Sequence, residues 1–136
     1  MTDAAEVMRL LALLGHEQPA GDAGSRLAAF IKQGQHVLVA HQSAGSAGQL
    51  LGALTLHVTP VLHRRGPIGR LTAVVVDESA RGKGVGRALV EAAEKFLAAQ
   101  KCALIEVTSN KKRVDAHAFY ESLGYTATSF RFAKTI

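Results

Sequence analysis

Apolar residues recur at helical spacing in two segments near the start of the chain. In residues 4–14, Val7, Leu10 and Leu11 fall three or four positions apart, which predicts an amphipathic helix. In the second segment, Leu27 and the Phe30–Ile31 pair follow the same spacing, and Gly34 is expected to end that helix.

Further along the chain, short runs of apolar and β-branched residues predict strands. The predicted strands are residues 36–42, 50–58, 68–77, 102–110 and 125–136. A segment rich in Ser and Gly, residues 43–49, would join the first two strands into a hairpin. The third strand ends in Ala-Val-Val-Val-Asp, which is too continuously apolar for a half-exposed strand, so we expect it at the centre of a sheet.

Two later helices alternate with the last strands. Their apolar stripes are Val85, Leu89, Ala92, Ala93 and Phe96, and then Ala116, Phe119, Tyr120 and Leu123, with Gly124 as a helix end. A strand–helix–strand order in one sheet favours parallel pairing of those strands. Because there is no internal repeat or long linker, we predict a single domain over residues 1–136, of the α/β (α+β) class.

Composition narrows the class of protein. The 136 residues are 48% hydrophobic and 20% charged, so the chain is neither a disordered tail nor a membrane span. A single cysteine, Cys102, excludes an internal disulfide and suits the cytoplasm, and Asp3 and Glu6 argue against a signal peptide. The net charge of +5 favours an anionic partner, either nucleic acid or a phosphorylated cofactor. With 5% aromatic residues and no Trp, stacking on single-stranded nucleic acid is disfavoured.

The stretch from Arg81 to Arg87, Arg-Gly-Lys-Gly-Val-Gly-Arg, lies between a predicted strand and a predicted helix. Free N–H groups at a helix start, glycines that admit close approach, and three cationic side chains together suit a phosphate. The alternative is a tight turn and nothing more. A Walker loop is absent, and a dinucleotide fingerprint fails because its third glycine would fall on Arg87 or Leu89.

What fits is R-x-x-G-x-G at 81–86, followed by Asp-Ala-His-Ala-Phe-Tyr-Glu-Ser-Leu-Gly-Tyr at 115–125. Together these segments resemble the two signatures of the GNAT superfamily of N-acetyltransferases, and the resemblance spans essentially the whole chain. It implies a mixed central sheet of about six strands, with the first strand short or missing, flanked by about four helices. It also implies acetyl-CoA as cosubstrate.

The resemblance assigns roles to particular residues. Backbone groups of the strand ending at Asp77 would pair with pantetheine, and the glycine turn would hold the pyrophosphate. The residues expected to bind acetyl-CoA are Val74, Val75, Val76, Arg81, Gly82, Lys83, Gly84, Val85, Gly86, Arg87, Asn110 and Tyr120. For Asn110, capping of the following helix is an equal alternative. Tyr120 would also protonate the departing thiolate, and the competing interpretation is a core aromatic.

The sequence leaves several alternatives for the general base, the group that takes a proton from the acceptor amine. Many members of the family carry a glutamate on the strand before the glycine turn, where this chain has Thr72. Glu106, a histidine or a water chain could serve instead. An alkylamine with a pKa near 10.4 must lose its proton to attack, at a cost of about 4–5 kcal/mol at pH 7.

The segments 110–125 and 129–136 resemble those of the aminoalkylphosphonate N-acetyltransferases and their relatives. A small anionic amine would suit a basic region near His57, His63, Arg64 and Arg65, although these side chains could also be solvated loop residues. His41 and His57 could be neighbours on the hairpin, but we expect no metal site because no pair shows helical zinc spacing.

The first hypothesis is therefore a small-molecule N-acetyltransferase. The alternatives are a protein N-terminal or lysine acetyltransferase, a non-catalytic CoA-binding module, and a nucleic-acid binder suggested by the charge. The expected partners are acetyl-CoA and a small amine, with no nucleic acid and no membrane, in a cytoplasmic protein that could be a homodimer.

Overall fold

The computed structural model describes residues 3–15, 21–42, 49–109 and 113–136. The chain divides into two compact units, residues 1–106 and 107–136. The first unit begins with two helices, α1 (Ala4–Ala12) and α2 (Ala23–Lys32). Both confirm predicted helices, and the Asp22 carboxylate caps α2 by accepting the Ser25 N–H at 2.8 Å.

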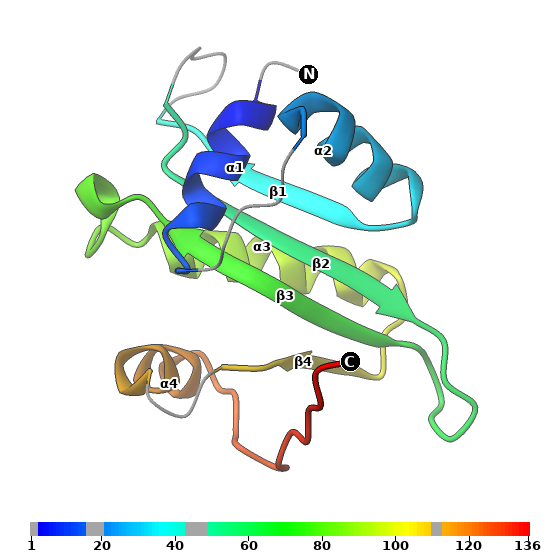
Figure 1. Cartoon of the computed structure of the whole chain (residues 1–136). Helices are drawn as coiled ribbons and strands as arrows, with labels where there is room; N and C mark the ends of the chain where they lie inside the picture. Colours follow the sequence, from blue (N-terminus) through cyan, green and yellow to red (C-terminus); the bar gives the residue numbers. More distant parts are fainter. Residues whose placement is uncertain (1–2, 16–20, 43–48, 110–112) are drawn as a thin grey trace. The chain divides into compact units, whose positions relative to one another are not determined.

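One sheet carries the strands β1 (His36–Ala40), β2 (Gly52–Thr59), β3 (Ile68–Val76) and β4 (Leu104–Val107), in that spatial order (Figure 1). The antiparallel pairing of β1 with β2 confirms the predicted hairpin, whose connecting residues 43–48 lie outside the described part of the chain. The central position of β3 confirms what its continuous apolar run predicts.

Helices cover both faces of the sheet. On one face, Val7 and Leu10 of α1 pack with Ala53 of β2 and Val75 of β3. On the other face lies α3 (Val85–Ala99), whose buried stripe includes Leu89, Val90, Ala93 and Leu97 (Figure 1). A Cβ at Gly52 would come within 3.0 Å of Leu89 Cδ1 and 3.1 Å of Val85 Cγ1, so glycine here allows the start of α3 to approach the sheet closely.

The strands β3 and β4 start side by side. The Ala103 N–H donates to the Pro67 carbonyl at 2.9 Å, and Arg70 Nη1 lies 3.3 Å from Glu106 Oε1. Both strands therefore run in the same direction, as the crossover through α3 predicts. Since β4 has four residues and β3 has nine, β4 runs beside only the first part of β3.

A β-bulge interrupts β3. Thr55 of β2 faces Ala73, whereas the next residue, Leu56, faces Leu71, so Thr72 is an extra residue on β3. The Thr72 hydroxyl lies 2.6 Å from the Thr55 hydroxyl, which places both side chains on the same face. Bulges bend a strand and leave the extra residue out of the ladder.

The second unit contains α4 (Val114–Ser122). Gly124, with φ +94°, ends the helix: its N–H donates to Glu121, and the Tyr125 N–H donates to the Tyr120 carbonyl, which is a Schellman arrangement. The predicted strand 125–136 is wrong, because these residues form no regular strand. Phe130 and Phe132 are exposed, and an extended segment becomes a strand only through ladder partners.

The described residues therefore form four strands rather than about six, with the predicted four helices. The last paired strand is also shorter than the predicted 102–110. The topology of the sheet matches the prediction, and the differences lie at its edges.

Candidate functional site

The glycine turn joins β3 to α3 through a short 3-10 helix, Glu78–Ala80. Gly82 and Gly84 have φ values of +77° and +82°, a left-handed conformation that favours glycine. A Cβ built on either residue would meet nothing within 4 Å. The main chain of the turn is therefore open to a ligand, and Gly84 precedes the free N–H groups at the start of α3.

Positive side chains surround this turn. Arg81, Lys83 and Arg87 are exposed, and Val85 and Gly86 are half-buried at the first turn of α3. Arg87 Nη1 also lies 3.5 Å from Glu91 Oε1, one helical turn further along. Because this ion pair is exposed, it contributes little to the stability of the fold. The turn thus combines a helix start with three cations, an arrangement that suits a phosphate group.

Near the turn, β3 extends beyond the four residues of β4. On one side, Val74–Val76 pair with Gly52–Leu54 of β2. On the other side, these residues extend beyond the end of β4. In a strand, the N–H and C=O groups of successive residues point alternately to the two sides. Val74–Val76 therefore present some of these groups on the side away from β2. This edge leads directly into the glycine turn.

A network that the sequence did not reveal holds the end of β3. Asp77 is buried, and its carboxylate accepts from Arg9 Nη1 at 2.6 Å and from the Ser79 N–H and hydroxyl. Arg9 also donates to Glu6 at 3.0 Å and to the Leu50 carbonyl at 3.3 Å. Hydrogen bonds from Ser79 and Arg9 hold the pKa of Asp77 well below its usual range. Helix α1 is thereby bonded to the residue at which the turn begins.

A second set of polar side chains lies on the face of the sheet that α1 covers. Thr55 and His57 alternate on β2, His57 faces Arg70 of β3, and Arg70 contacts Glu106 of β4. The Thr55–Thr72 hydroxyl bond adds the bulge residue. We call these five residues the polar cluster. They place Thr72, the position where a glutamate was expected, on the same face as Glu106.

In the second unit, Tyr120 lies on α4 between two other aromatic rings. Its ring centroid is 5.3 Å from that of Phe119 and 6.1 Å from that of Tyr125. Burial raises the pKa of the Tyr120 phenol above its ordinary value, and the nearby Arg113 charge acts in the opposite direction. The phenol therefore keeps its proton at neutral pH. Asn110 lies outside the described residues.

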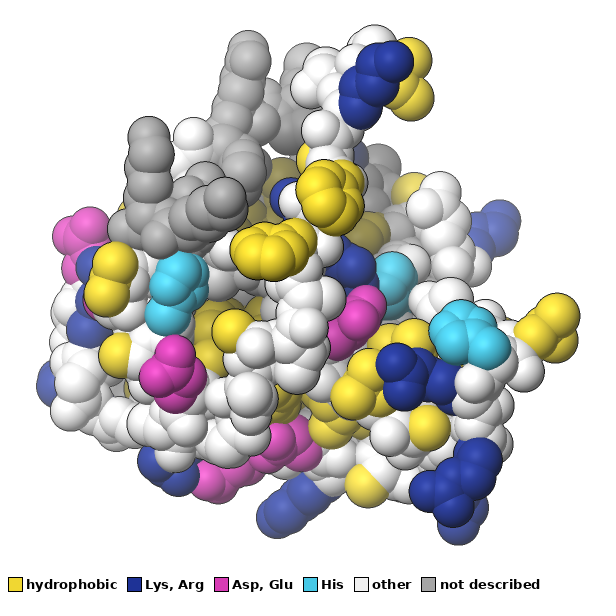
Figure 2. Space-filling view, turned by 90° about the horizontal axis from the view of Figure 1, so that it is seen from below, with side chains coloured by type: hydrophobic (Ala, Val, Ile, Leu, Met, Phe, Trp, Pro, Cys, Tyr) yellow, Lys and Arg dark blue, Asp and Glu magenta, His cyan; other side chains and the backbone are white. Residues whose placement is uncertain are grey.

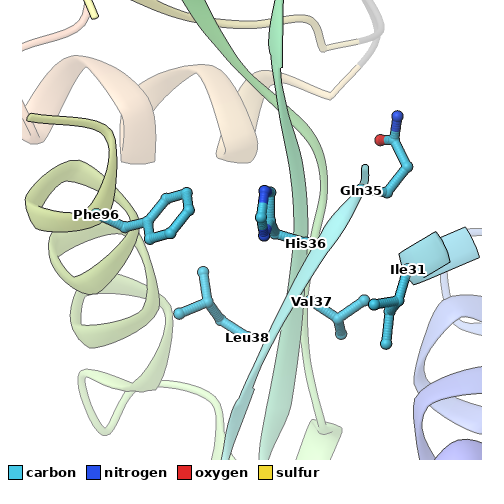
Figure 3. Close-up of a pocket in the computed structure, with 6 residues that line it drawn as sticks. All are labelled: Ile31, Gln35, His36, Val37, Leu38 and Phe96. Atoms are coloured by element: carbon cyan, nitrogen blue, oxygen red, sulfur yellow. The ribbon is translucent and has the colours of Figure 1, made fainter. Parts of the chain in front are cut away.

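A cavity of about 240 Å³ lies at the beginning of β1, lined by Ile31, Gln35, His36, Val37, Leu38 and Phe96 (Figure 3). The rings of His36 and Phe96 are 4.7 Å apart. Figure 3 shows His36 and Leu38 toward Phe96, and Val37 toward Ile31 on the other side of the strand. The cavity is smaller than typical ligand pockets of about 300–1,000 Å³. It contains no residue expected to bind acetyl-CoA.

The predicted proximity of His41 and His57 is wrong. In the hairpin register His36 faces Leu56 and Ala40 faces Gly52, so the two histidines lie at opposite ends. His41 instead lies 3.8 Å from Asp3. Among the residues that the structure describes, no three His, Cys, Asp or Glu side chains gather as a metal site would require.

Basic side chains do not form one continuous stripe on the face shown in Figure 2, where Asp and Glu side chains stand between them. Within the described ranges, no helix is long and apolar enough to cross a membrane.

The model of the Acetyltransferase (GNAT) family matches residues 7–125. The chain belongs to this family. The match includes the glycine turn, the polar cluster and Tyr120, and the architecture agrees with it. A putative acetyltransferase from Agrobacterium tumefaciens str. C58 superposes with a TM-score of 0.85 at 27% identity, covering 98% of this chain and 94% of that one.

Two curated relatives match the chain in part. An aminoalkylphosphonate N-acetyltransferase of Salmonella typhimurium (strain LT2) is 36% identical over 89 residues, which are 65% of this chain and 58% of that protein. A glucosamine 6-phosphate N-acetyltransferase of Trypanosoma brucei brucei is 33% identical over 81 residues, which are 59% of this chain and 53% of that protein. The matches thus span little more than half the length of each relative.

Proposed function

We propose that this GNAT protein is an acetyl-CoA-dependent N-acetyltransferase that acts on a primary amine of a small molecule. The observation that carries the proposal is the open glycine turn at the start of α3, with its three exposed cations and no side chain above Gly82 or Gly84. Membership of the GNAT family supports acetyl-CoA as the anionic ligand of this turn.

The chain offers a continuous track for such a ligand. The N–H groups at the start of α3 would bind the pyrophosphate, with Arg81, Lys83 and Arg87 lowering its charge. The edge of β3 at Val74–Val76 on the side away from β2 would pair with the amides of pantetheine, as an added strand does. In this proposal the thioester lies toward Thr72, where the bulge interrupts the strand.

The transfer needs two proton movements. The ammonium form of the acceptor first loses one proton, and its lone pair then forms the C–N bond with the thioester carbon. As the C–S bond breaks, the sulfur takes a proton from the Tyr120 hydroxyl. The nitrogen releases its second proton to solvent, and the Tyr120 phenolate takes a proton back from solvent. A raised pKa supports this role, because the Tyr120 phenol is then protonated when the thiolate departs.

The relatives suggest a class of acceptor. Their names give an aminoalkylphosphonate and a glucosamine 6-phosphate, each of which joins an amine to a phosphorus oxyanion. We propose an amine of this kind as the first class to assay. His63, Arg64 and Arg65 form an exposed basic loop after β2, and His57 is half-buried at its base.

The proposal is tested by Gly84→Glu. The new carboxylate would enter the pyrophosphate position, so calorimetry should detect no acetyl-CoA binding. Gly34→Glu is a matched control, because Gly34 has φ +87° and open space around it but lies after α2. Equal acetyl-CoA affinity in both variants would contradict the assignment of the turn.

A non-catalytic CoA-binding module is a second candidate, favoured by Thr72 at the usual position of the glutamate. It predicts that acetyl-CoA binds but no amine is acetylated. A thiol-release assay over aminoalkylphosphonates, amino sugars, aminoglycosides and polyamines separates the two functions.

A further inference from the structure

The polar cluster crosses three neighbouring strands on one face of the sheet. Alternation along β2 places Thr55 and His57 on that face, and the cross-strand pair puts Arg70 beside His57. The same face carries Val75, which packs against α1 nearer the glycine turn. Side chains of Arg70 and Glu106 are 32% and 41% exposed, so the cluster is reachable by a solute.

Glu106 lies near the end of β4. It is the penultimate residue of β4, and its contact with Arg70 shows how far along β3 the strand β4 reaches. Thr72 lies two residues beyond Arg70 along β3, on the same face, and Val74–Val76 follow it. The cluster therefore borders the inner end of the track proposed for pantetheine.

The chemistry of the cluster suits an ammonium group. Glu106 supplies a carboxylate, and the two threonine hydroxyls offer further acceptor lone pairs. Arg70 Nη1 lies 3.3 Å from one oxygen of this carboxylate, and in the proposed complex the ammonium group binds the second oxygen. A charge-assisted bond to a partly buried carboxylate is among the stronger hydrogen bonds in proteins.

We propose that Glu106 binds the ammonium group of the acceptor amine, and that Arg70 is the positioning residue for its carboxylate. The inference rests on the proposed function, since it places the acceptor next to the acetyl group. It identifies the cluster as the specificity site for amines that are cationic before reaction.

Glu106→Gln tests this role because it keeps the size of the side chain and removes its charge. The KM for 2-aminoethylphosphonate or glucosamine 6-phosphate, whichever the wild type acetylates faster, should rise about 10-fold or more. The KM for acetyl-CoA should stay unchanged. Glu94→Gln, on α3 at the other face of the sheet, is the matched control and should alter neither constant.

A readout based on substrate charge separates binding from a structural role. The aminooxy analogue of the same substrate, whose reacting nitrogen is neutral at pH 7.5, should lose less activity in Glu106→Gln than the cationic amine does. Arg70→Met should shift the amine KM in the same direction, and Arg70→Lys should restore part of it. A merely structural defect would lower the rates with both substrates equally.

The outcomes are distinguishable from failure of the proposed function. If the wild type acetylates an amine and Glu106→Gln has the same amine KM, the role of Glu106 is overturned while the enzyme assignment stands. If calorimetry shows acetyl-CoA binding but no amine on the panel is acetylated, the acceptor site is overturned. Absence of acetyl-CoA binding to the wild type overturns the proposed function itself.

Discussion

Tyr120 is the residue whose surroundings bear most directly on chemistry. Its backbone carbonyl takes part in the Schellman end of α4, and its ring contacts Phe119 and Tyr125. These contacts hold the phenol in place, and burial keeps it protonated. In the proposed reaction, this neutral phenol would protonate the departing thiolate.

Tyr120→Phe removes the proton and little else. We expect kcat to fall about 100-fold or more, the usual range for loss of a general acid, with the KM for acetyl-CoA unchanged. Steady-state thiol release measures both constants. Phe119→Leu serves as a control for aromatic packing, and an unaltered kcat in Tyr120→Phe would show that another group protonates the sulfur.

At the scale of secondary-structure elements, α1 is connected to the glycine turn by ionic hydrogen bonds. Arg9 contacts Glu6 and Asp77, and Glu6 accepts the Leu50 N–H at 2.9 Å. Arg9 and the Leu50 N–H lower the pKa of Glu6, as Ser79 and Arg9 lower that of Asp77. The pair Arg9–Asp77 also neutralises a carboxylate beside a turn that suits an anion.

Replacing Arg9 by Met should therefore weaken acetyl-CoA binding several-fold. The Asp77 carboxylate would no longer be neutralised, and the residue at which the turn begins would lose its hydrogen bond to α1. Acetyl-pantetheine lacks the pyrophosphate, so its kcat/KM should change less than that of acetyl-CoA. Lys32→Met, at the exposed end of α2, is the control for loss of one positive charge. Equal losses with both thioesters would indicate general destabilisation.

The same network predicts how stability depends on pH. The pKa values of Asp77 and Glu6 are lowered by folding, so their contribution is complete above about pH 5 and is lost as the pH falls further. In urea titrations from pH 7 to pH 2, Asp77→Asn should flatten this acid decline. A decline identical to that of the wild type would contradict the burial of a charged Asp77.

At the scale of the whole molecule, a ligand that binds only the folded state raises its thermal stability. Acetyl-CoA at 100 times its Kd should add about 2.7 kcal/mol, a shift in Tm on the order of 8 °C for a chain of this size. Gly84→Glu should show no shift. A larger shift with duplex DNA than with acetyl-CoA would instead favour the nucleic-acid alternative suggested by the net charge of +5.

Cytoplasmic location, dimerisation and a single domain over the whole chain stay predictions.

The amino-acid sequence by itself determined the features that depend on local pattern. Periodicity placed four helices and the hairpin, the continuous run in 73–76 placed β3 at the centre, and two short signatures indicated the GNAT family. It failed at residues 125–136, because apolar alternation predicts a strand whether or not a neighbouring strand is there to pair with.

Only the tertiary structure decided how distant residues meet. Arg9 and Asp77 are 68 positions apart, and Arg70 and Glu106 are 36 apart, so no spacing rule connects them. The sequence does not predict the bulge at Thr72 either, because the bulge arises from the register between two strands. Local pattern specifies which elements form, whereas packing and register specify which side chains share a face, and the proposed acceptor site depends on the latter.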